Sequence, residues 1–471
     1  MSKKPLLMQA LALVVVMAGS QSTGSAQCIR QDETPVFRTT DNGVYNLYDE
    51  NAPKFITPVP KGYKAVGISH YGRHGSRYYT GTRLKMAQLE ETLVRAENEG
   101  ILSERGKQIL HSYQEILPTI KHRESELTQL GRRQHEGIAE RMYRQYPGLF
   151  TREATVTAWS TLVPRCMESM AAFCEKLARL APKTPIGEEA SARYLGQVSS
   201  TQEYYLLYNA SAKKQVAALR APSYEGIDPA SLRDALFTRP FLPEKEMRDF
   251  AVGLWYIYMS IPGSDVRDTP QACAFRYAVD GKACEAGPGM APVISDSLWN
   301  QLQYAELNTH LSEACGPVLH HSTLNIFMVE AMLKLADEDL QGGKPFARLR
   351  FGHDTILMTV LKDMGIRGWR KWEACDTLSQ EQAWKKTEAE WNTSRVPMAS
   401  NLQMVFYKKK GSPVLFKLML NESELELPIE AVSGRIYDWE TFKAYMAPRI
   451  EKGKAEALPY LKYPYPIYTQ Y

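Results

Sequence analysis

The chain has 471 residues, of which 44% are hydrophobic and 23% are charged, so a collagen-like or intrinsically disordered protein is excluded. The formal net charge is only +4, which excludes a strongly basic nucleic-acid-binding protein, and we expect no nucleic-acid partner. At roughly 100 to 200 residues per domain, the length predicts two to four structural units.

The first 26 residues have the pattern of an export signal. Lys3 and Lys4 precede an apolar run over residues 6–18, and the small residues Gly24-Ser25-Ala26 form a cleavage site. The run is shorter than the about 20 apolar residues that a membrane-spanning helix needs, and no later segment approaches that length. We therefore expect residues 1–26 to be removed and the mature chain to be periplasmic or secreted, without a membrane span.

The cysteines all follow the expected cleavage site: Cys28, Cys166, Cys174, Cys273, Cys284, Cys315 and Cys375. Export to an oxidising compartment predicts disulfides, and Cys273 and Cys284 are the best local pair. Seven is an odd number, so at least one cysteine is free or bonded to another chain. A lipid anchor on Cys28 is disfavoured because Gln27 is not the small residue expected before an acylated cysteine. The spacing of cysteines and histidines predicts no metal site.

Expected strands and helices then alternate along the chain. Apolar runs bounded by turn signals predict strands over residues 65–69, 155–161 and 348–351. Helical spacing of apolar residues predicts helices over residues 83–98, 127–146, 164–180 and 355–364. The repeated order of strand, polar loop and helix is typical of an α/β fold.

Residues 185–310 are tyrosine-rich and helix-patterned, which predicts an inserted, mainly α-helical domain. Between Asn401 and Leu420, two alternating runs flank a Gly-Ser-Pro turn and predict an antiparallel hairpin at the sheet edge. We therefore expect an α/β domain formed by residues 27–184 and 311–471, in which helices flank a mainly parallel central sheet in three layers.

A cationic loop follows the first expected strand. Arg73, His74 and Arg77 lie at its carboxyl end, where open α/β sheets place ligand sites. Two guanidiniums match the oxygens of a phosphate, and nearby cations lower the pKa of a histidine, which keeps it nucleophilic. The alternative is a solvated, arginine-rich loop with an incidental histidine.

A second loop, after the strand over residues 348–351, carries His353 and Asp354. A carboxyl group beside a phosphate-binding histidine is suited to protonating a leaving alkoxide. The alternative is that Asp354 only caps the helix that begins at Thr355.

Four motifs resemble those of the histidine acid phosphatases. Arg73-His74-Gly75-Ser76-Arg77 resembles their RHGxR signature, and His353-Asp354 resembles their distal HD pair. Residues 127–131 resemble the LTxxG segment that follows the signature. Residues 160–170 resemble the stretch that supplies a further phosphate-binding arginine, here Arg165.

Two stretches, RHGSRYYT and ELTQLG, are most similar in sequence to the multiple inositol polyphosphate phosphatase branch, which includes phytases. That branch often has His-Ala-Glu at the distal site, whereas His353-Asp354-Thr355 has the pattern of bacterial phytases and glucose phosphatases. The difference concerns the substrate and leaves the chemistry unchanged.

The resemblance implies a phosphatase that needs no metal or other cofactor and acts on a small phosphorylated molecule. His74 would attack phosphorus and form a phosphohistidine, and Asp354 would protonate the leaving oxygen. The phosphoryl oxygens would be held by Arg73, Arg77, Arg165 and His353.

The substrate expected from this resemblance is an inositol polyphosphate. Four basic residues are candidates to contact its outlying phosphates: Arg83, Lys85, Lys213 and Lys214. The alternative is that these side chains are solvated at the surface and contact no substrate. Two rival functions stay open. One is a sugar-phosphate or nucleotide phosphatase of the same fold, and the other is a phosphate-binding protein without turnover.

Overall fold

The computed structural model describes residues 43–80, 86–199, 210–281, 290–314, 321–366, 369 and 396–457. Only the backbone is described for residues 210–216, 219, 307–308, 311–314 and 321–324. All of the described residues belong to one unit of the chain, Pro35–Tyr471.

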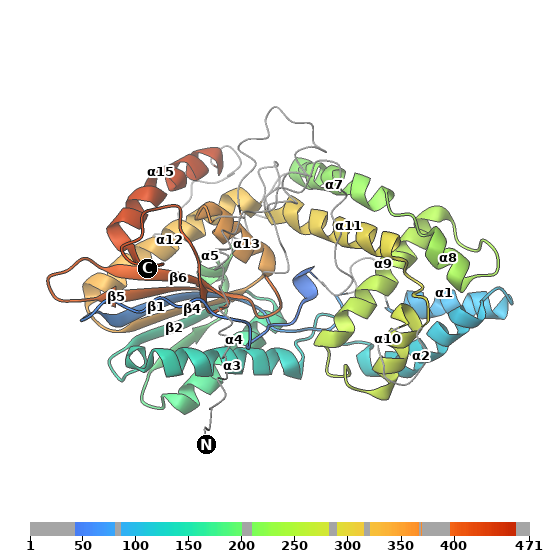
Figure 1. Ribbon diagram of the computed structural model, residues 1–471, viewed down its shortest axis with the longest axis horizontal. Helices are drawn as coiled ribbons and strands as arrows, with labels where there is room; N and C mark the ends of the chain where they lie inside the picture. The colour runs from blue at the N-terminus through green and yellow to red at the C-terminus, as the bar shows by residue number, and fades with distance from the viewer. Residues whose placement is uncertain are drawn as a thin grey trace, which may run out of the picture. The chain divides into compact units, whose positions relative to one another are not determined.

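A mixed β-sheet runs through this unit in the order β3-β2-β4-β1-β5-β6-β7, with β8 paired to β6 (Figure 1). Neighbouring strands among β3, β2, β4 and β1 are parallel. Strand β5 is antiparallel to β1, and β6 is antiparallel to β5. The strands are β1 Lys64–Arg73, β2 Thr155–Ser160, β3 Ile186–Glu189, β4 Phe346–Gly352, β5 Asn401–Lys408, β6 Leu415–Leu420, β7 Ser423–Glu424 and β8 Tyr437–Asp438. The predicted strands and the edge hairpin are therefore confirmed.

The sheet is apolar on both faces. Successive side chains of a strand point to opposite faces, and in β5 Met404 and Phe406 belong to one core cluster while Val405 and Tyr407 belong to another. A sheet that is apolar on both sides must be covered on both sides. This pattern explains why helices flank the sheet in three layers, as predicted.

Two groups of helices provide this cover (Figure 1). On one face, α4 (Pro164–Leu180) contacts β2 and β4, and α3 (Gln129–Gln145) packs against α4. On the other face, α12 (His321–Gly342) and α13 (Asp354–Asp363) contact β1, and α15 (Trp439–Ala457) packs against α12. Pro164 is the first residue of α4, as predicted from its fixed backbone angle.

The remaining long helices pack mainly on one another. They are α1 Met86–Asn98, α2 Glu104–Ile120, α7 Ala210–Glu225, α8 Ala230–Leu236, α9 Glu244–Ser260, α10 Pro270–Asp280 and α11 Asp296–Ala314. Helix α2 contacts α8 and α10, and α1 contacts α9. Short α5 (Leu195–Val198) lies instead against the sheet, and β3 is one of its strands. The division into an α/β domain and an inserted domain over residues 185–310 stays a prediction.

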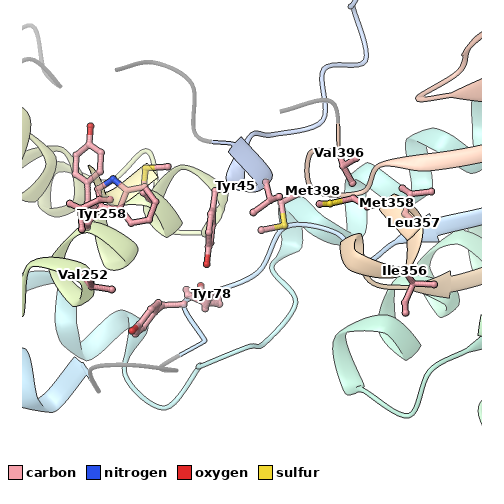
Figure 2. Packing of buried hydrophobic residues seen from close by; sticks show 14 of the residues in the cluster. Tyr45, Tyr78, Val252, Tyr258, Ile356, Leu357, Met358, Val396 and Met398 are labelled. Atoms are coloured by element: carbon pink, nitrogen blue, oxygen red, sulfur yellow. The ribbon is translucent and has the colours of Figure 1, made fainter. Parts of the chain in front are cut away.

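The larger core cluster is continuous from these helices to the sheet. Figure 2 shows Tyr45 and Tyr78 between Val252 of α9 and Met358 of α13, and all four belong to that cluster. Helix α11 contacts both α7 and α13, so it forms a second connection beside the end of β4. None of the described helices has the length and apolar character that crossing a membrane requires.

Candidate active site

The two polar loops predicted from the sequence meet in the structure. Strands β1 and β4 are parallel neighbours, and their last residues, Arg73 and Gly352, are paired. The His74 backbone N–H donates to the Gly352 carbonyl oxygen over 2.9 Å. The rings of His74 and His353 consequently lie edge to face, with their centroids 5.7 Å apart.

Two glycines let the first loop lie directly on helix α3. A Cβ atom at Gly75 would be 2.5 Å from the Gly131 carbonyl oxygen, and one at Gly131 would be 2.4 Å from that of Ser76. Real Cβ atoms do not approach this closely, so both positions require glycine. Thr128, the N-cap of α3, accepts a hydrogen bond from the Gly131 N–H and donates to the Ser76 carbonyl oxygen. The backbone of the loop that carries His74 is thus fixed by the start of α3.

His74 is buried and held in one tautomer. Its Nδ1 lies 2.9 Å from the Gly75 carbonyl oxygen, which can only accept, so Nδ1 carries the proton. The Nε2 lone pair is then the nucleophilic one. Burial lowers the pKa of His74 well below its usual range, and the charges of Arg165 and Arg73 lower it further. The ring is therefore neutral even in mildly acidic solution.

Arg73 is fully buried, and both terminal nitrogens of its guanidinium already have partners within the protein. Nη1 donates to the carbonyl oxygens of Val44 and Val396 over 2.6 and 2.8 Å. Nη2 lies 2.7 Å from Asp354 Oδ2. Arg73 thus fixes Asp354 beside His74, in addition to its expected role as a phosphate ligand.

Arg77 and Arg165 differ from Arg73 because, among the described residues, no carboxylate forms an ion pair with either. Arg77 is buried, with its guanidinium 5.3 Å from the Tyr45 ring centre. Arg165 is the second residue of α4, and its buried Nε has no hydrogen-bond partner in the described part of the chain. Arg77 is buried and Arg165 is half-buried. Cations largely withdrawn from water without a carboxylate are costly, so the pair forms a site that favours an anion.

His353 is the N-cap of α13 and lies against Cys166. The Cys166 sulfur is 3.7 Å from His353 Nε2, and the His353 backbone N–H donates to the Tyr71 hydroxyl over 3.3 Å. Burial, and to a lesser extent Arg165, lowers the pKa of His353 to about 4. A neutral ring can donate one N–H to a bound oxygen.

Asp354 is the first residue of α13, one position earlier than predicted for that helix. Oδ1 accepts a hydrogen bond from the Thr355 N–H over 2.8 Å, so Asp354 does satisfy a free N–H at the helix start. Burial raises the pKa of Asp354, but Arg73 and then His310 lower it more, so that the pKa lies well below its usual range. Asp354 is therefore a carboxylate in this structure.

Several solved structures share this arrangement of strands and helices. The multiple inositol polyphosphate phosphatase of Bifidobacterium longum, in complex with inositol hexasulfate, has a TM-score of 0.68 at 17% identity, covering 86% of this chain and 97% of that one. Its complex with phosphate has a TM-score of 0.65 at 16% identity, with the same coverage. The phytase from D. castellii has a TM-score of 0.56 at 14% identity and covers 87% of this chain and 84% of its own. The chain has the histidine acid phosphatase fold.

No protein-family model and no curated protein sequence matches the chain. At identities of this size, the histidine acid phosphatase fold is shown by the shared architecture alone.

The structure adds one titratable site residue that the sequence analysis missed. His310 of α11 lies with Nε2 3.7 Å from Asp354 Oδ2. A signal was present, because Glu306 and His310 are four residues apart on one helix, a spacing that places two side chains together. Nothing in the sequence indicates that this helix packs on α13.

The remaining predicted contacts are untested. Arg83 and Lys85 lie outside the described residues, and for Lys213 and Lys214 only the backbone of α7 is described. Cys166 and Cys174, both on α4, are free thiols. Cys284 lies outside the described residues, so its pairing with Cys273 stays a prediction. The described residues contain no group of three or more histidine, cysteine or acidic side chains that could hold a metal ion.

Proposed function

We propose that the chain is a histidine acid phosphatase that hydrolyses phosphomonoesters through a phosphohistidine at His74. One observation carries this proposal. A neutral histidine, with Nδ1 hydrogen-bonded to a carbonyl oxygen, lies among the guanidiniums of Arg73, Arg77 and Arg165, and the last two have no carboxylate partner in the described structure. This combination suits attack on a phosphoryl group, because the ring supplies a lone pair and the cations stabilise the charged oxygens.

The first step forms the covalent intermediate. His74 Nε2 attacks phosphorus in line with the ester oxygen, the Nε2–P bond forms and the P–O bond breaks. Arg77, Arg165 and His353 donate hydrogen bonds to the three equatorial oxygens. The leaving oxygen takes a proton from Asp354, so it departs as a neutral alcohol and not as an alkoxide, which is a poor leaving group.

The second step regenerates the enzyme. Asp354, now a carboxylate again, takes a proton from water as the water oxygen attacks phosphorus. The Nε2–P bond breaks, phosphate leaves, and His74 keeps the tautomer fixed by Gly75. The residues present provide the nucleophile, the charge stabilisation and the acid that the two steps need.

The proposed substrates are inositol polyphosphates. Support comes from the structural neighbours, which are an inositol polyphosphate phosphatase bound to inositol hexasulfate and a phytase, and from the motif wording. A sugar-phosphate or nucleotide phosphatase of this fold is the alternative. A binding protein without turnover is disfavoured, because binding needs neither a nucleophile nor an acid.

We also propose that the protein is exported, to the periplasm or the medium, because residues 1–26 have the pattern of a cleaved signal. Mass analysis of the mature protein tests this point. An N-terminus near Gln27 supports cleavage, and a retained N-terminus or an acylated Cys28 contradicts it.

Release of inorganic phosphate tests the enzymatic function. Turnover is measured with p-nitrophenyl phosphate, phytate, glucose 1-phosphate and a nucleoside monophosphate, for the wild type, His74→Ala and His111→Ala. His111 is an exposed histidine of α2 and serves as the matched control. We expect activity in the wild type and the control, none in His74→Ala, and the highest kcat/KM for phytate. Tight phosphate binding without turnover would indicate the binding protein.

A further inference from the structure

Three titratable side chains lie in a row beside the proposed site. His310 Nε2 is 3.7 Å from Asp354 Oδ2, and His310 Nδ1 is 3.1 Å from the Glu306 backbone carbonyl oxygen and 3.3 Å from Glu306 Oε1. The exposed fractions of the three side chains are only 14%, 15% and 10% for Asp354, His310 and Glu306. Each ring nitrogen of His310 therefore faces a carboxylate in a largely buried setting.

Other elements bring further groups to this row. From β1, Arg73 is ion-paired with the same Asp354 oxygen that faces His310. From α9, the Tyr256 hydroxyl donates a hydrogen bond to Glu306 Oε2. Tyr45 lies near Glu306 as well, with the Arg77 guanidinium 5.3 Å from its ring centre. An imidazolium at His310 is thus placed between two carboxylates, which favour its charged form.

The row bears on a difficulty in the proposed mechanism. Asp354 has to give a proton to the leaving oxygen, yet in the structure it is a carboxylate paired with Arg73. A proton must therefore reach Asp354 from another group. His310 is the titratable side chain whose ring nitrogen faces the Asp354 carboxylate within 4 Å in the described structure.

We propose that His310 supplies the proton that Asp354 passes to the leaving oxygen and takes it back during hydrolysis, with Glu306 orienting the imidazole. In the first step, the Nε2–H proton of His310 moves to Asp354 Oδ2, Asp354 then passes a proton to the ester oxygen, and His310 is left neutral. In the second step, the proton removed from water passes through Asp354 to His310. The net reaction is unchanged: ester and water give alcohol and phosphate.

This inference rests on the proposed phosphatase function and assigns His310 a positioning role, because it acts through Asp354 and does not touch the reacting atoms. The separation of 3.7 Å is longer than a hydrogen bond. Contacts of catalytic acids and bases are often long without substrate, and they tighten or are bridged by one water in the complex.

The test compares two leaving groups in His310→Gln. Glutamine keeps a side-chain N–H donor but cannot titrate. With glycerol 2-phosphate, whose alkoxide needs a proton, we expect kcat to fall about 10-fold to 100-fold. With p-nitrophenyl phosphate, whose phenolate needs little help, kcat should change less than about 3-fold. The basic limb of the kcat profile for glycerol 2-phosphate should also move to lower pH.

Matched variants separate this relay from a structural role. His111→Gln changes an exposed histidine and should leave both substrates and both pH profiles unchanged. Added imidazole should restore part of the activity of His310→Ala on glycerol 2-phosphate, and should change its activity on p-nitrophenyl phosphate little. If His310→Gln does not fold, Glu306→Gln provides the same comparison, with a smaller loss in the same direction.

Equal losses on the two substrates, or an unchanged ratio and pH profile, would overturn the relay. Failure of the proposed function itself looks different. In that case the wild type would not hydrolyse p-nitrophenyl phosphate, whereas failure of the relay alone leaves that activity and its dependence on His74 intact.

Discussion

Arg73 and Asp354 form a buried ion pair that joins the two loops of the site, with 2.7 Å between Nη2 and Oδ2. Arg73 is the last residue of β1, and Asp354 lies two residues beyond the end of β4, the adjacent parallel strand, although the two residues are far apart in the chain. The pair keeps Asp354 ionised until a proton arrives, and it fixes the carboxylate beside His74.

Replacing Arg73 tests how much this ion pair contributes to the free energy of unfolding. Arg73→Met should lower the free energy of unfolding by about 3 to 5 kcal/mol, because it leaves a buried carboxylate and two carbonyl oxygens without their donor. Arg132→Met, which removes an exposed pair with Glu175, should cost about 0 to 1 kcal/mol. Urea unfolding measures both changes, and equal losses in the two variants would contradict the prediction.

The contact between Gly75 and Gly131 predicts a second effect. A Cβ in Gly131→Ala would lie 2.4 Å from the Ser76 carbonyl oxygen, so the loop that carries His74 must shift. We expect kcat to fall about 100-fold while the circular dichroism spectrum is kept. Gly148→Ala is the control, because no atom lies within 4 Å of its added Cβ. Wild-type turnover in Gly131→Ala would show that the loop does not depend on this contact.

Replacing Asp354 with asparagine tests its role as the acid. Asp354→Asn keeps an acceptor for the Thr355 N–H but has no proton to give. Rapid quench should therefore show a burst of product with p-nitrophenyl phosphate and almost none with phytate. Equal slowing of phosphoryl transfer for both substrates would mean that Asp354 only holds the helix and the loop in place.

Buried neutral histidines predict a loss of stability in acid. Burial lowers the pKa of His135 to about 4, against about 6.5 in the unfolded chain. Between these values the unfolded state binds the extra proton, so stability falls as the pH falls from 6.5 to 4. His135→Gln should reduce this slope by up to about 1.4 kcal/mol per pH unit, measured by urea unfolding at several pH values. His111→Gln, at an exposed site, should not change it.

Local signals were enough to predict β1, β2, β4, the hairpin of β5 and β6, and the start of α4. They did not predict β3, which lies in a stretch predicted to be helical, or the two-residue strands β7 and β8. Pro164 sets the helix start by its own backbone angle, and the apolar run before His74 predicts a buried strand from composition alone. Both polar loops could be located in the same way, since each directly follows a strand.

Contacts across the chain could not be predicted. The sequence suggests Asp354 as an acid, but its ionised state depends on Arg73, which reaches it only after β1 and β4 pair. The place of His310 likewise depends on the packing of α11 against α13. A helical pattern shows which side chains share a face and does not show which element that face meets.

The most direct test of the account is to locate the covalent phosphoryl group. The wild type is mixed rapidly with p-nitrophenyl phosphate, quenched in alkali to preserve phosphohistidine, digested and analysed by mass spectrometry, with His74→Ala treated in parallel. The account predicts a phosphoryl group on His74 in the wild type and none in the variant. A phosphoryl group on another residue, or turnover with no phosphoenzyme at all, would contradict it.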